Sequence, residues 1–461
     1  MNTKTSNSES RIFRTYSNET PTSAELYRRA QAAFPMGVTH QSRQLDPHPI
    51  FVARAQGSHK WDVDNREYID YFGGHGALIL GHNHPVVQEA VSAQLSRGVH
   101  YGASHKLELE WAELIKSLIP HVEKVRFTVT GTEATHLALR VARAHTGKSK
   151  VVRLATHFHG WHDHVAFGKD TASRTPPPGI LQEIVDNVLV CPPGNISQLT
   201  EFCANRDDLA AVILEPTGAT FGKVPLAPQF LSDIRQWTDQ RGIILIFDEV
   251  ISGFRCSLGG AQTFYGVTPD LTTLAKILGG GYPAAALVGR AEVMNVMDYQ
   301  RGEDGVRPPL VIHHGTYNAG PISASAGIAT LKFLQSTATI DVANRSAAML
   351  RQEMNAVVKQ LGCDWCVYGD FSAFHIFTNP DHESVTPEDI MAGRVDFWKL
   401  RGATSAELLN KIRVGFLCGG VDIVPWPGGL VSGVHSGEDL EKTIVAFENL
   451  LKMLAEEGIL G

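Results

Sequence analysis

The sequence predicts a doubly wound α/β fold, in which helices cover both faces of a mainly parallel β-sheet. From about residue 124 to residue 288, short apolar runs alternate with stretches of helical period. Apolar residues make up 43% of the 461 residues, which is enough for a large core and two or three domains. Polar residues with reactive side chains follow several of the apolar runs. In open α/β sheets, ligands bind at the carboxyl ends of the strands, so these residues are candidate site residues.

Upstream of the sheet, the sequence predicts a helix and a small set of strands. Ser23–Phe34 has apolar residues at helical spacing, and Phe51–Phe72 alternates like paired strands with a turn at Asp64-Asn65. Two further helices are predicted at about Pro85–Ser96 and Leu107–Leu118.

Six strands are expected in the sheet. They are Lys124–Val129, Lys150–Leu154, Val188–Val190, Ala211–Leu214, Ile243–Phe247 and Ala285–Val288. A helix at about Pro321–Leu334 leads out of this region, and Gly437–Glu457 predicts an amphipathic helix at the end of the chain. We expect a loose tail over residues 1–22, an N-terminal segment over 23–80, a large domain over 81–335 and a smaller C-terminal domain over 336–461.

Composition and charge exclude several classes of protein. The chain has 41 basic and 48 acidic residues, and no basic run is interleaved with aromatic residues, which disfavours nucleic acid and anionic membranes as partners. No apolar run approaches the ~20 residues that span a bilayer, and residues 1–22 lack a signal-peptide core. We therefore expect a soluble, cytoplasmic protein. The six cysteines are expected to be free thiols, including the unaccompanied pair Cys363 and Cys366.

Lys276 and Asp248 form the most informative pair of residues. Lys276 stands at a predicted strand end before a glycine-rich turn, and Asp248 ends the apolar run that begins at Ile243. Pyridoxal phosphate needs such a pair, namely a Schiff-base lysine and an acid beside the pyridinium nitrogen. Taken singly, the two residues are better explained as a surface lysine and a helix-capping acid. Together they predict a pyridoxal phosphate enzyme.

A phosphate-binding loop is the next requirement, and Phe127–Ala134 is a candidate. Small residues at a helix N-terminus present backbone N–H groups and a positive dipole end to an anion, so Gly131 and Thr132 are candidate phosphate ligands. The alternative is an ordinary N-cap without a ligand. The loop is not a Walker loop and lacks GxGxxG spacing, which disfavours nucleotides.

The segment Ala155–His164 contains four histidines and an acid. A metal centre, and with it a zinc hydrolase, is one alternative for His157–His164, but further ligands are not found in a recognisable setting. In the favoured interpretation Phe158 stacks on a ring, Gly160 permits a sharp turn and Trp161 lines a pocket. Glu215 at another strand end, and Thr316 in His-Gly-Thr, are further candidates for cofactor contacts.

These motifs together resemble the class III pyridoxal phosphate aminotransferases, in the branch that contains glutamate-1-semialdehyde aminomutase. The resemblance runs from about Ser23 to Lys452 and rests on an ordered set of motifs. They are Gly131–Ala134, Phe158–Gly160, Glu215-Pro216, Phe247–Arg255, Leu274–Gly281 and His314–Thr316. The resemblance implies fold type I, with a large domain built on a mainly parallel seven-stranded sheet. The C-terminal part and the N-terminal segment would form the smaller α/β domain.

The resemblance also implies residue roles. Lys276 would bind the cofactor and move the substrate's proton, and Asp248 would pair with the ring nitrogen. Thr316 would reach the phosphate of the neighbouring subunit, which implies a homodimer with shared active sites. The remaining cofactor contacts implied by position are Gly131, Thr132, Phe158, His159, Glu215 and Val250.

Two positions depart from the family pattern. Phe158 stands where tyrosine is frequent, and the residues after Thr316 read Tyr-Asn-Ala-Gly-Pro where relatives usually end in Gly-Asn-Pro. The first departure removes a hydroxyl from the cofactor's surroundings. The second leaves the local backbone open.

The substrate residues are predicted within the same branch. Gly37–Arg43 resembles a substrate loop, so Arg43 is the candidate carboxylate anchor, with a solvated arginine as the alternative. His75 replaces an aromatic residue of the aminomutase, and its surroundings resemble D-phenylglycine aminotransferase. We therefore expect a transaminase for an aromatic or bulky amino acid, with the D and β types included, and an oxo acid such as 2-oxoglutarate as acceptor. Glutamate-1-semialdehyde aminomutase is the alternative.

Overall fold

The computed structural model describes residues 10–169, 175–298 and 310–460, and these fall into two compact units. The larger unit comprises Pro85–Ile340 and Asp389–Arg401. The smaller unit is formed by the described parts of Met1–His84, Asp341–Glu388 and Gly402–Gly461. Each unit is described separately below.

The larger unit is built on a seven-stranded sheet. Its strands, in spatial order, are β4 (Lys124–Thr128), β11 (Ala285–Gly289), β10 (Leu271–Ala275), β9 (Ile244–Glu249), β7 (Leu209–Leu214), β5 (Lys150–Leu154) and β6 (Val188–Cys191). Strand β11 pairs antiparallel with both of its neighbours, and every other pairing in this sheet is parallel. The predicted α/β fold with a mainly parallel seven-stranded sheet is therefore confirmed.

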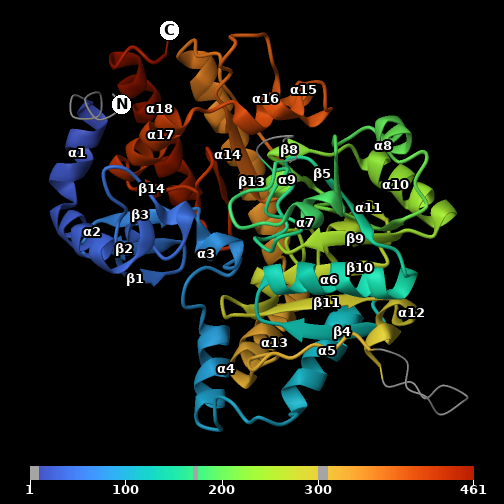
Figure 1. Cartoon of the computed structure of the whole chain (residues 1–461). Coiled ribbons are helices and arrows are strands. Elements are labelled where there is room, and N and C mark those ends of the chain that lie inside the picture. The colour runs from blue at the N-terminus through green and yellow to red at the C-terminus, as the bar shows by residue number, and fades with distance from the viewer. Residues whose placement is uncertain (1–9, 170–174, 299–309, 461) are drawn as a thin grey trace, which may run out of the picture. The chain divides into compact units, whose positions relative to one another are not determined.

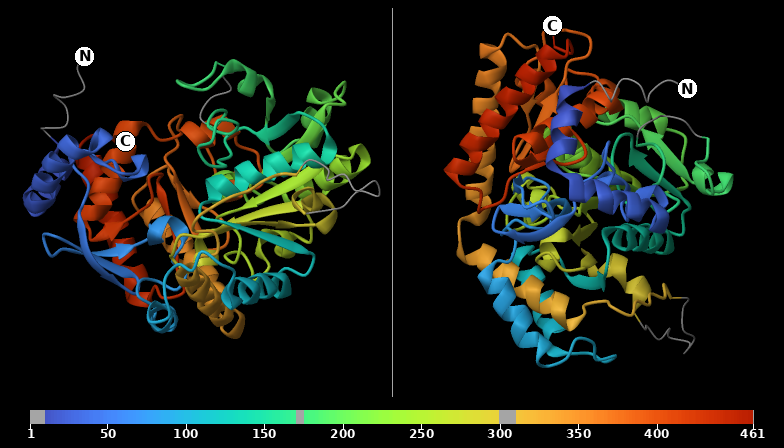
Figure 2. Two further views of the ribbon diagram at one scale, coloured as in Figure 1. Left: turned by 60° about the horizontal axis from the view of Figure 1, so that its bottom comes forward. Right: turned by 90° about the vertical axis from the view of Figure 1, so that its left-hand side faces the viewer.

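Side chains that alternate along the strands are buried under helices on opposite faces of the sheet. Ile213 and Ile246 belong to the core that α6 (Gly131–Thr146) contributes to, whereas their neighbours Val212 and Leu245 belong to the core under α10 (Pro228–Arg241). Figure 1 shows α6 lying along the sheet, and Figure 2 shows the layers from two further directions. A strand buried on both faces must be apolar throughout, which is why these strands appear as continuous apolar runs.

Helix α13 (Pro321–Ser336) packs on the turn that follows β10. A Cβ atom at Gly327 would lie 2.4 Å from the carbonyl oxygen of Leu278 and 2.6 Å from the ring of Trp111, so only glycine permits this approach. The turn after Lys276 is therefore supported by a helix from a distant part of the sequence. Helices α4 (Pro85–Leu95) and α5 (Lys106–Leu118) pack against the same helix.

The remaining elements of the larger unit are short. They are α7 (Gln182–Asp186), α8 (Ile196–Phe202), α9 (Ala219–Gly222), β8 (Val224–Pro225), α11 (Gly260–Tyr265), η3 (Lys276–Gly279), α12 (Ala291–Met294), η4 (Asn295–Met297), α15 (Pro387–Met391) and α16 (Phe397–Gly402), of which the last two extend slightly beyond Asp389–Arg401. The segment Asp389–Arg401 was expected in the C-terminal domain. It groups with the larger unit, where Lys223 Nζ donates to the carbonyl oxygen of Arg401 at 3.1 Å.

The smaller unit contains two sheets and several helices. One sheet is β1 (Val52–Gln56), β2 (His59–Asp62), β3 (Glu67–Asp70) and β14 (Val421–Asp422), and the other is β12 (Cys366–Tyr368), β13 (Ala373–Phe377) and β15 (Gly428–Leu430). The helical elements are α2 (Pro21–Ala33), η1 (Pro35–Gly37), η2 (Gln41–Arg43), α3 (Gly73–Gly76), α14 (Thr339–Gln360), which begins at the end of the larger unit, α17 (Ala406–Cys418) and α18 (Gly437–Glu456). Residues from the N-terminal and C-terminal thirds share one core, which includes Tyr68, Leu350, Phe374, Phe416 and Phe447.

The expectation of a loose tail over residues 1–22 is wrong from Ser10 onward; residues 1–9 lie outside the described residues. Residues Arg11–Glu19 form helix α1, whose Ile12, Phe13 and Tyr16 are buried in the core of the smaller unit. Polar residues dominate the composition of this segment and conceal the three apolar positions on one helical face. A contact far along the chain also fixes the helix, because Glu457 accepts hydrogen bonds from the Ser10 hydroxyl and the Ile12 amide.

Among the helices of the described residues, none is both long and apolar enough to cross a bilayer.

We predict that Phe13→Ala lowers the free energy of unfolding of the smaller unit by about 3–4 kcal/mol, because a buried aromatic ring is lost from a packed core. The exposed neighbour Arg14 provides the matched control, and Arg14→Ala should change the free energy by no more than about 0.5 kcal/mol. Urea unfolding of both variants measures the difference. Equal midpoints for Phe13→Ala and the unsubstituted protein would show that α1 does not belong to the core.

Candidate active site

Lys276 follows the last residue of β10 and begins the turn η3. Its backbone is left-handed, with φ of 52°, a conformation that costs a residue other than glycine about 1–3 kcal/mol and is found mainly at functional sites. Burial, together with the positive charge of Arg255, lowers the pKa of Lys276 to about 8, although Asp248 and Glu215 oppose the shift. A lysine with a lowered pKa is more often neutral near pH 8, and only the neutral amine is a nucleophile or a base.

Asp248 lies in β9, beside the strand that leads to Lys276. Its register partner in β10 is Thr273, whose hydroxyl donates to Oδ1 at 3.1 Å, and the amide of Val250 donates to the same oxygen at 3.1 Å. The other oxygen, Oδ2, lies 2.7 Å from Nδ1 of His159. Burial raises the pKa of Asp248 to about 6, so the carboxylate is ionised above that pH with both oxygens held in place.

The proton between Asp248 and His159 resides on the histidine. Burial and the positive charge of Arg153 lower the pKa of His159 well below 6.5, so the ring is neutral at physiological pH. A neutral ring close to a carboxylate places its single proton on the nitrogen that faces the carboxylate, which is Nδ1 here. The pair is therefore an anionic aspartate with a neutral hydrogen-bond donor.

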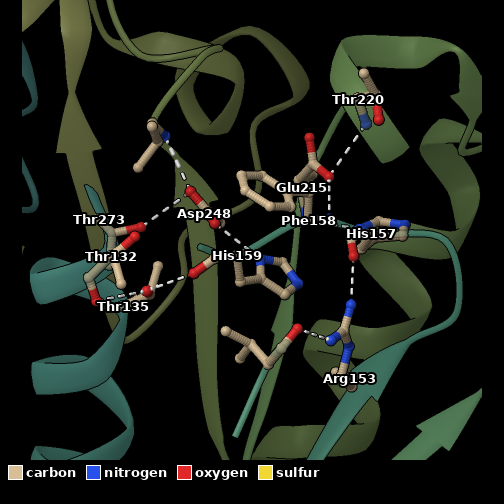
Figure 3. A network of polar contacts seen from close by, with 12 residues as sticks. Thr132, Thr135, Arg153, His157, Phe158, His159, Glu215, Thr220, Asp248 and Thr273 are labelled. Carbon is tan, nitrogen blue, oxygen red and sulfur yellow. Dashed lines mark hydrogen bonds and ion pairs between the residues drawn. The ribbon is translucent and has the colours of Figure 1, made fainter. Parts of the chain in front are cut away.

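Contacts from three parts of the larger unit hold the backbone of His157, Phe158 and His159, as Figure 3 shows. The carbonyl of His157 accepts from Arg153 of β5, and the amide of Phe158 donates to Glu215 at 2.8 Å. The carbonyl of His159 accepts from the Thr135 hydroxyl of α6 at 2.6 Å. The backbone of this segment is thus fixed from three sides, while the His159 side chain reaches Asp248.

Glu215 is a buried carboxylate that binds the backbone. Besides the Phe158 amide, it accepts from the amides of Thr220 at 3.1 Å and Phe221 at 3.3 Å, two residues with left-handed φ of 55°. Its own amide donates to Nδ1 of His157 at 2.9 Å. Burial and the nearby Asp248 raise the pKa of Glu215 to about 7. The carboxylate therefore shapes the Phe158 wall through backbone bonds, and its direct contact with the cofactor stays a prediction.

The N-terminus of α6 has the features of an anion site. The Thr130 hydroxyl accepts from the Glu133 amide, and the Glu133 carboxylate accepts from the amides of Val129 at 3.0 Å and Thr130 at 2.7 Å. Amides in the first turn of a helix have no acceptor within the helix, so those of Gly131 and Thr132 are available to an anion.

Two glycines allow the parts of this cradle to approach one another. A Cβ atom on Gly131 would lie 3.0 Å from the Val250 side chain, and a Cβ atom on Gly160 would lie 2.5 Å from the Thr132 hydroxyl. The predicted phosphate residues, Val250 and the Phe158–Gly160 turn are therefore neighbours in the structure. Phe158 is 47% exposed and Trp161 is 78% exposed, so neither ring belongs to the core, and their roles at a pocket stay predictions.

Thr316 lies on an exposed segment beside the edge strand β4. Arg126 of β4 holds this segment, because its Nε donates to Nδ1 of His313 at 3.0 Å and a second nitrogen donates to the His313 carbonyl. Two successive turns follow, closed by the amides of Asn318 and Gly320. These turns form the backbone of the segment after Thr316, where the sequence departs from the family pattern. The contact of Thr316 with a neighbouring subunit, and the homodimer itself, stay predictions.

Arg43 and His75 belong to the smaller unit, and the structure brings their two loops together. The Arg43 guanidinium donates to the Thr39 hydroxyl at 3.0 Å, and the ring of His40 lies 4.6 Å from the ring of His75. His75 stands in a turn of left-handed residues, with φ of 60°. Their roles toward a substrate stay predictions.

A zinc centre at His157–His164 is contradicted by the structure. Within the described ranges, no group of three or more His, Cys, Asp or Glu side chains is arranged to hold a metal ion. His157 and His159 are already hydrogen-bonded to Glu215 and Asp248, which explains why the cluster does not converge on one point. All six cysteines are free, as expected.

Three residues of this network were missed by sequence reasoning, namely Thr135, Arg153 and Thr273, and His157 was considered only as a metal ligand. Arg153 carries a recognisable signal, because a charged residue in the middle of an apolar strand needs partners in the interior. Thr273 becomes apparent only from strand register, and Thr135 only from the approach of α6.

The comparisons with known proteins agree with this geometry. Residues 40–387 match the family model described as Aminotransferase class-III. The chain belongs to the class-III aminotransferases. It is 37% identical to a glutamate-1-semialdehyde 2,1-aminomutase of Methanothrix thermoacetophila, over 93% of this chain and 96% of that protein.

Two solved transaminases share both fold and sequence with this class-III aminotransferase. An omega-transaminase from Sphaerobacter thermophilus has a TM-score of 0.82 and 32% identity, with 93% of this chain and 97% of that chain covered. A transaminase with bound pyridoxal phosphate has a TM-score of 0.84 and 31% identity, with coverage of 95% and 99%. The protein is thus a fold type I enzyme, its cofactor is pyridoxal phosphate, and its substrates are small amino and oxo compounds.

We predict that Gly160→Ala weakens binding of pyridoxal phosphate by about tenfold or more, because the new methyl group would overlap Thr132 at the phosphate cradle. Gly147 is a matched control, since it also has a left-handed backbone, with φ of 69°, but nothing lies within 4 Å of its Cβ position. Gly147→Ala should lower stability by about 1 kcal/mol and leave cofactor affinity unchanged. Titration of the apoprotein with the cofactor, followed by absorbance, compares the two. Equal affinities would mean that Gly160 does not shape the cradle.

Proposed function

We propose that this class-III aminotransferase is an amino-acid transaminase, which transfers the amino group of an amino acid to an oxo acid such as 2-oxoglutarate. One observation carries the proposal. The amine of Lys276 has a lowered pKa, and the carboxylate of Asp248 is ionised and hydrogen-bonded at both oxygens. The two residues lie at the ends of neighbouring parallel strands. Removal of a proton from the α-carbon of an amino acid needs both a base and a charged partner for the cofactor ring.

The residues fit pyridoxal phosphate. The cradle at Gly131 and Gly160, which a Cβ atom would fill, and the first-turn amides of α6 suit the phosphate. Asp248 suits the protonated ring nitrogen, and the exposed ring of Phe158 suits one face of the pyridine. When bound, the cofactor supplies an aldehyde for the substrate amine and an electron-withdrawing ring.

Lys276 acts as the base in this proposal. Its Nζ receives the proton that leaves the substrate's α-carbon, and the pKa near 8 lets the same group release that proton again. Asp248 remains anionic because Thr273, Val250 and His159 donate hydrogen bonds to it. An anion at this position favours the protonated ring nitrogen and thus the withdrawal of electrons from the α-carbon.

Substrate choice is assigned to residues outside this machinery. Arg43 would bind the α-carboxylate, and His75 and Trp161 would surround the side chain. The exposed rings of Phe158 and Trp161 favour an aromatic or bulky amino acid, with the D and β types included. Two solved transaminases, each more than 30% identical over nearly all of this chain, support transfer between two substrates.

A glutamate-1-semialdehyde 2,1-aminomutase is the second candidate. The 37% identity to a protein of that name, over 93% of this chain, favours it. The reaction would use the same lysine and aspartate, so these residues do not discriminate between the two. The candidates differ in whether an external amino acceptor is required.

The experiment that tests the proposal is a half-reaction. Purified enzyme is mixed with a panel of α- and β-amino acids of both configurations, and conversion of bound pyridoxal to pyridoxamine is followed by absorbance. At least one donor should convert the cofactor, and Lys276→Ala should remove the conversion because the base is lost. In a parallel assay, glutamate 1-semialdehyde is supplied without an acceptor. Formation of 5-aminolevulinate there, with no donor active in the first assay, would replace the proposal by the second candidate.

A further prediction concerns Arg43. We expect Arg43→Ala to raise KM for the amino acid by one to two orders of magnitude, because a charge-assisted hydrogen bond contributes roughly 1.5–3 kcal/mol. Amines that lack a carboxylate should be little affected. Arg29, an exposed arginine of α2 in the same unit, is the matched control, and Arg29→Ala should leave KM unchanged. If both substrate types respond alike to Arg43→Ala, the carboxylate binds elsewhere.

A further inference from the structure

Arg153 is a permanently charged side chain in the interior of the larger unit. It lies in β5 and is fully buried. One terminal nitrogen donates to the carbonyl oxygen of Val165 at 2.5 Å and to that of Phe167, and the other donates to the carbonyl of His157. All three acceptors belong to residues 157–167, the segment that leaves the strand and carries Phe158 and His159 (Figure 3).

The three bonds determine the shape of this segment. The guanidinium of Arg153 holds the start of the segment at His157 and the end of the segment at Val165 and Phe167. Thr135 pins the middle through the carbonyl of His159. A guanidinium has the donors and the rigid fork needed to serve three carbonyls at once. The position of His159 against Asp248 therefore depends on Arg153.

The charge of Arg153 has a second effect, because its burial leaves it poorly screened. It lowers the pKa of His157, His159 and His162, in each case in addition to burial. The ionisable groups around the pair come from several elements. The ionisable groups around His159 are Asp248 of β9, Arg153 of β5, and His157 and His162 of its own segment. Asp248 is in addition influenced by the charges of Lys276 and Glu215. Of these groups, Arg153 is the fixed positive charge beside the imidazole.

We propose that Arg153 is a positioning residue for the reaction, which shapes the 157–167 segment and keeps His159 a neutral Nδ1–H donor so that Asp248 bears the negative charge. The inference rests on the role proposed above for Asp248 at the ring nitrogen. A protonated His159 would share the charge of Asp248 and weaken its effect on that nitrogen. Arg153 thus acts on the cofactor through His159 and Asp248, without a contact of its own being required.

The test compares Arg153→Met, which removes the charge, with Arg153→Lys, which retains it, in the holoenzyme. Both variants should melt at lower temperature, since both lose carbonyl bonds. The pH titration of the absorbance of bound cofactor, without substrate, separates the two effects. Its midpoint should rise by about one pH unit in Arg153→Met and stay within about 0.3 unit of the unsubstituted enzyme in Arg153→Lys.

Titration curves that coincide in all three proteins, alongside lower melting temperatures, would overturn the proposal and leave Arg153 a purely structural residue. If Arg153→Met does not fold, the unsubstituted holoenzyme provides the decisive measurement. Nitrogen-15 NMR of labelled histidine, with His159→Gln to assign the signal, should show a neutral ring protonated on Nδ1 between pH 6 and 9. An imidazolium at pH 7 would overturn the proposal. None of these measurements depends on which amino acid is the substrate. Failure of the transaminase proposal would appear in the half-reaction with amino donors and not in these titrations, so the two failures are distinguishable.

Discussion

The hydrogen bond between His159 and Asp248 is the interaction on which the rest of the site depends. Asp248 is buried, and burial alone would favour its neutral form. The amide of Val250 and the hydroxyl of Thr273 satisfy one oxygen and His159 satisfies the other, so the carboxylate can remain charged in the interior. A buried charge that is fully hydrogen-bonded is also fixed in direction, as an electrostatic partner for a cofactor must be.

The parallel sheet explains why these groups meet. Strands β5, β7, β9 and β10 run in the same direction, so the residues at or just beyond their carboxyl ends gather along one edge. The segment of His159 follows β5, Glu215 follows β7, Asp248 is the penultimate residue of β9 and Lys276 follows β10. Helix α6 adds its N-terminus and Thr135 to the same edge. Each element contributes one part of the site, and none contributes enough to act alone.

The residues assigned to proton transfer and the candidate residues for substrate binding belong partly to different units. Lys276 and the hydrogen bonds of Asp248 lie within the larger unit, where they serve any reaction that begins with loss of a proton from an amine-bearing carbon. Of the candidate residues for substrate binding, Arg43 and His75 belong to the smaller unit and Trp161 belongs to the larger unit. Membership in the class-III aminotransferases therefore determines the cofactor, whereas transaminase and aminomutase remain distinguished by their need for an acceptor.

The sequence by itself predicted the α/β class, the cofactor and the two central residues, because each depends on local patterns, but it missed strand β10 of the sheet. Apolar runs buried on both faces appear as strands, and the ordered motifs around Lys276 and Asp248 identify the family. Only the tertiary structure decided how the site is supported. Helix α1 is buried because Phe13 and Glu457, at opposite ends of the chain, meet partners in the same unit. Arg153 serves carbonyls in the loop that folds back over it, and Thr273 meets Asp248 through strand register. Such contacts join residues that the sequence separates, and no local period or motif records which of them will touch.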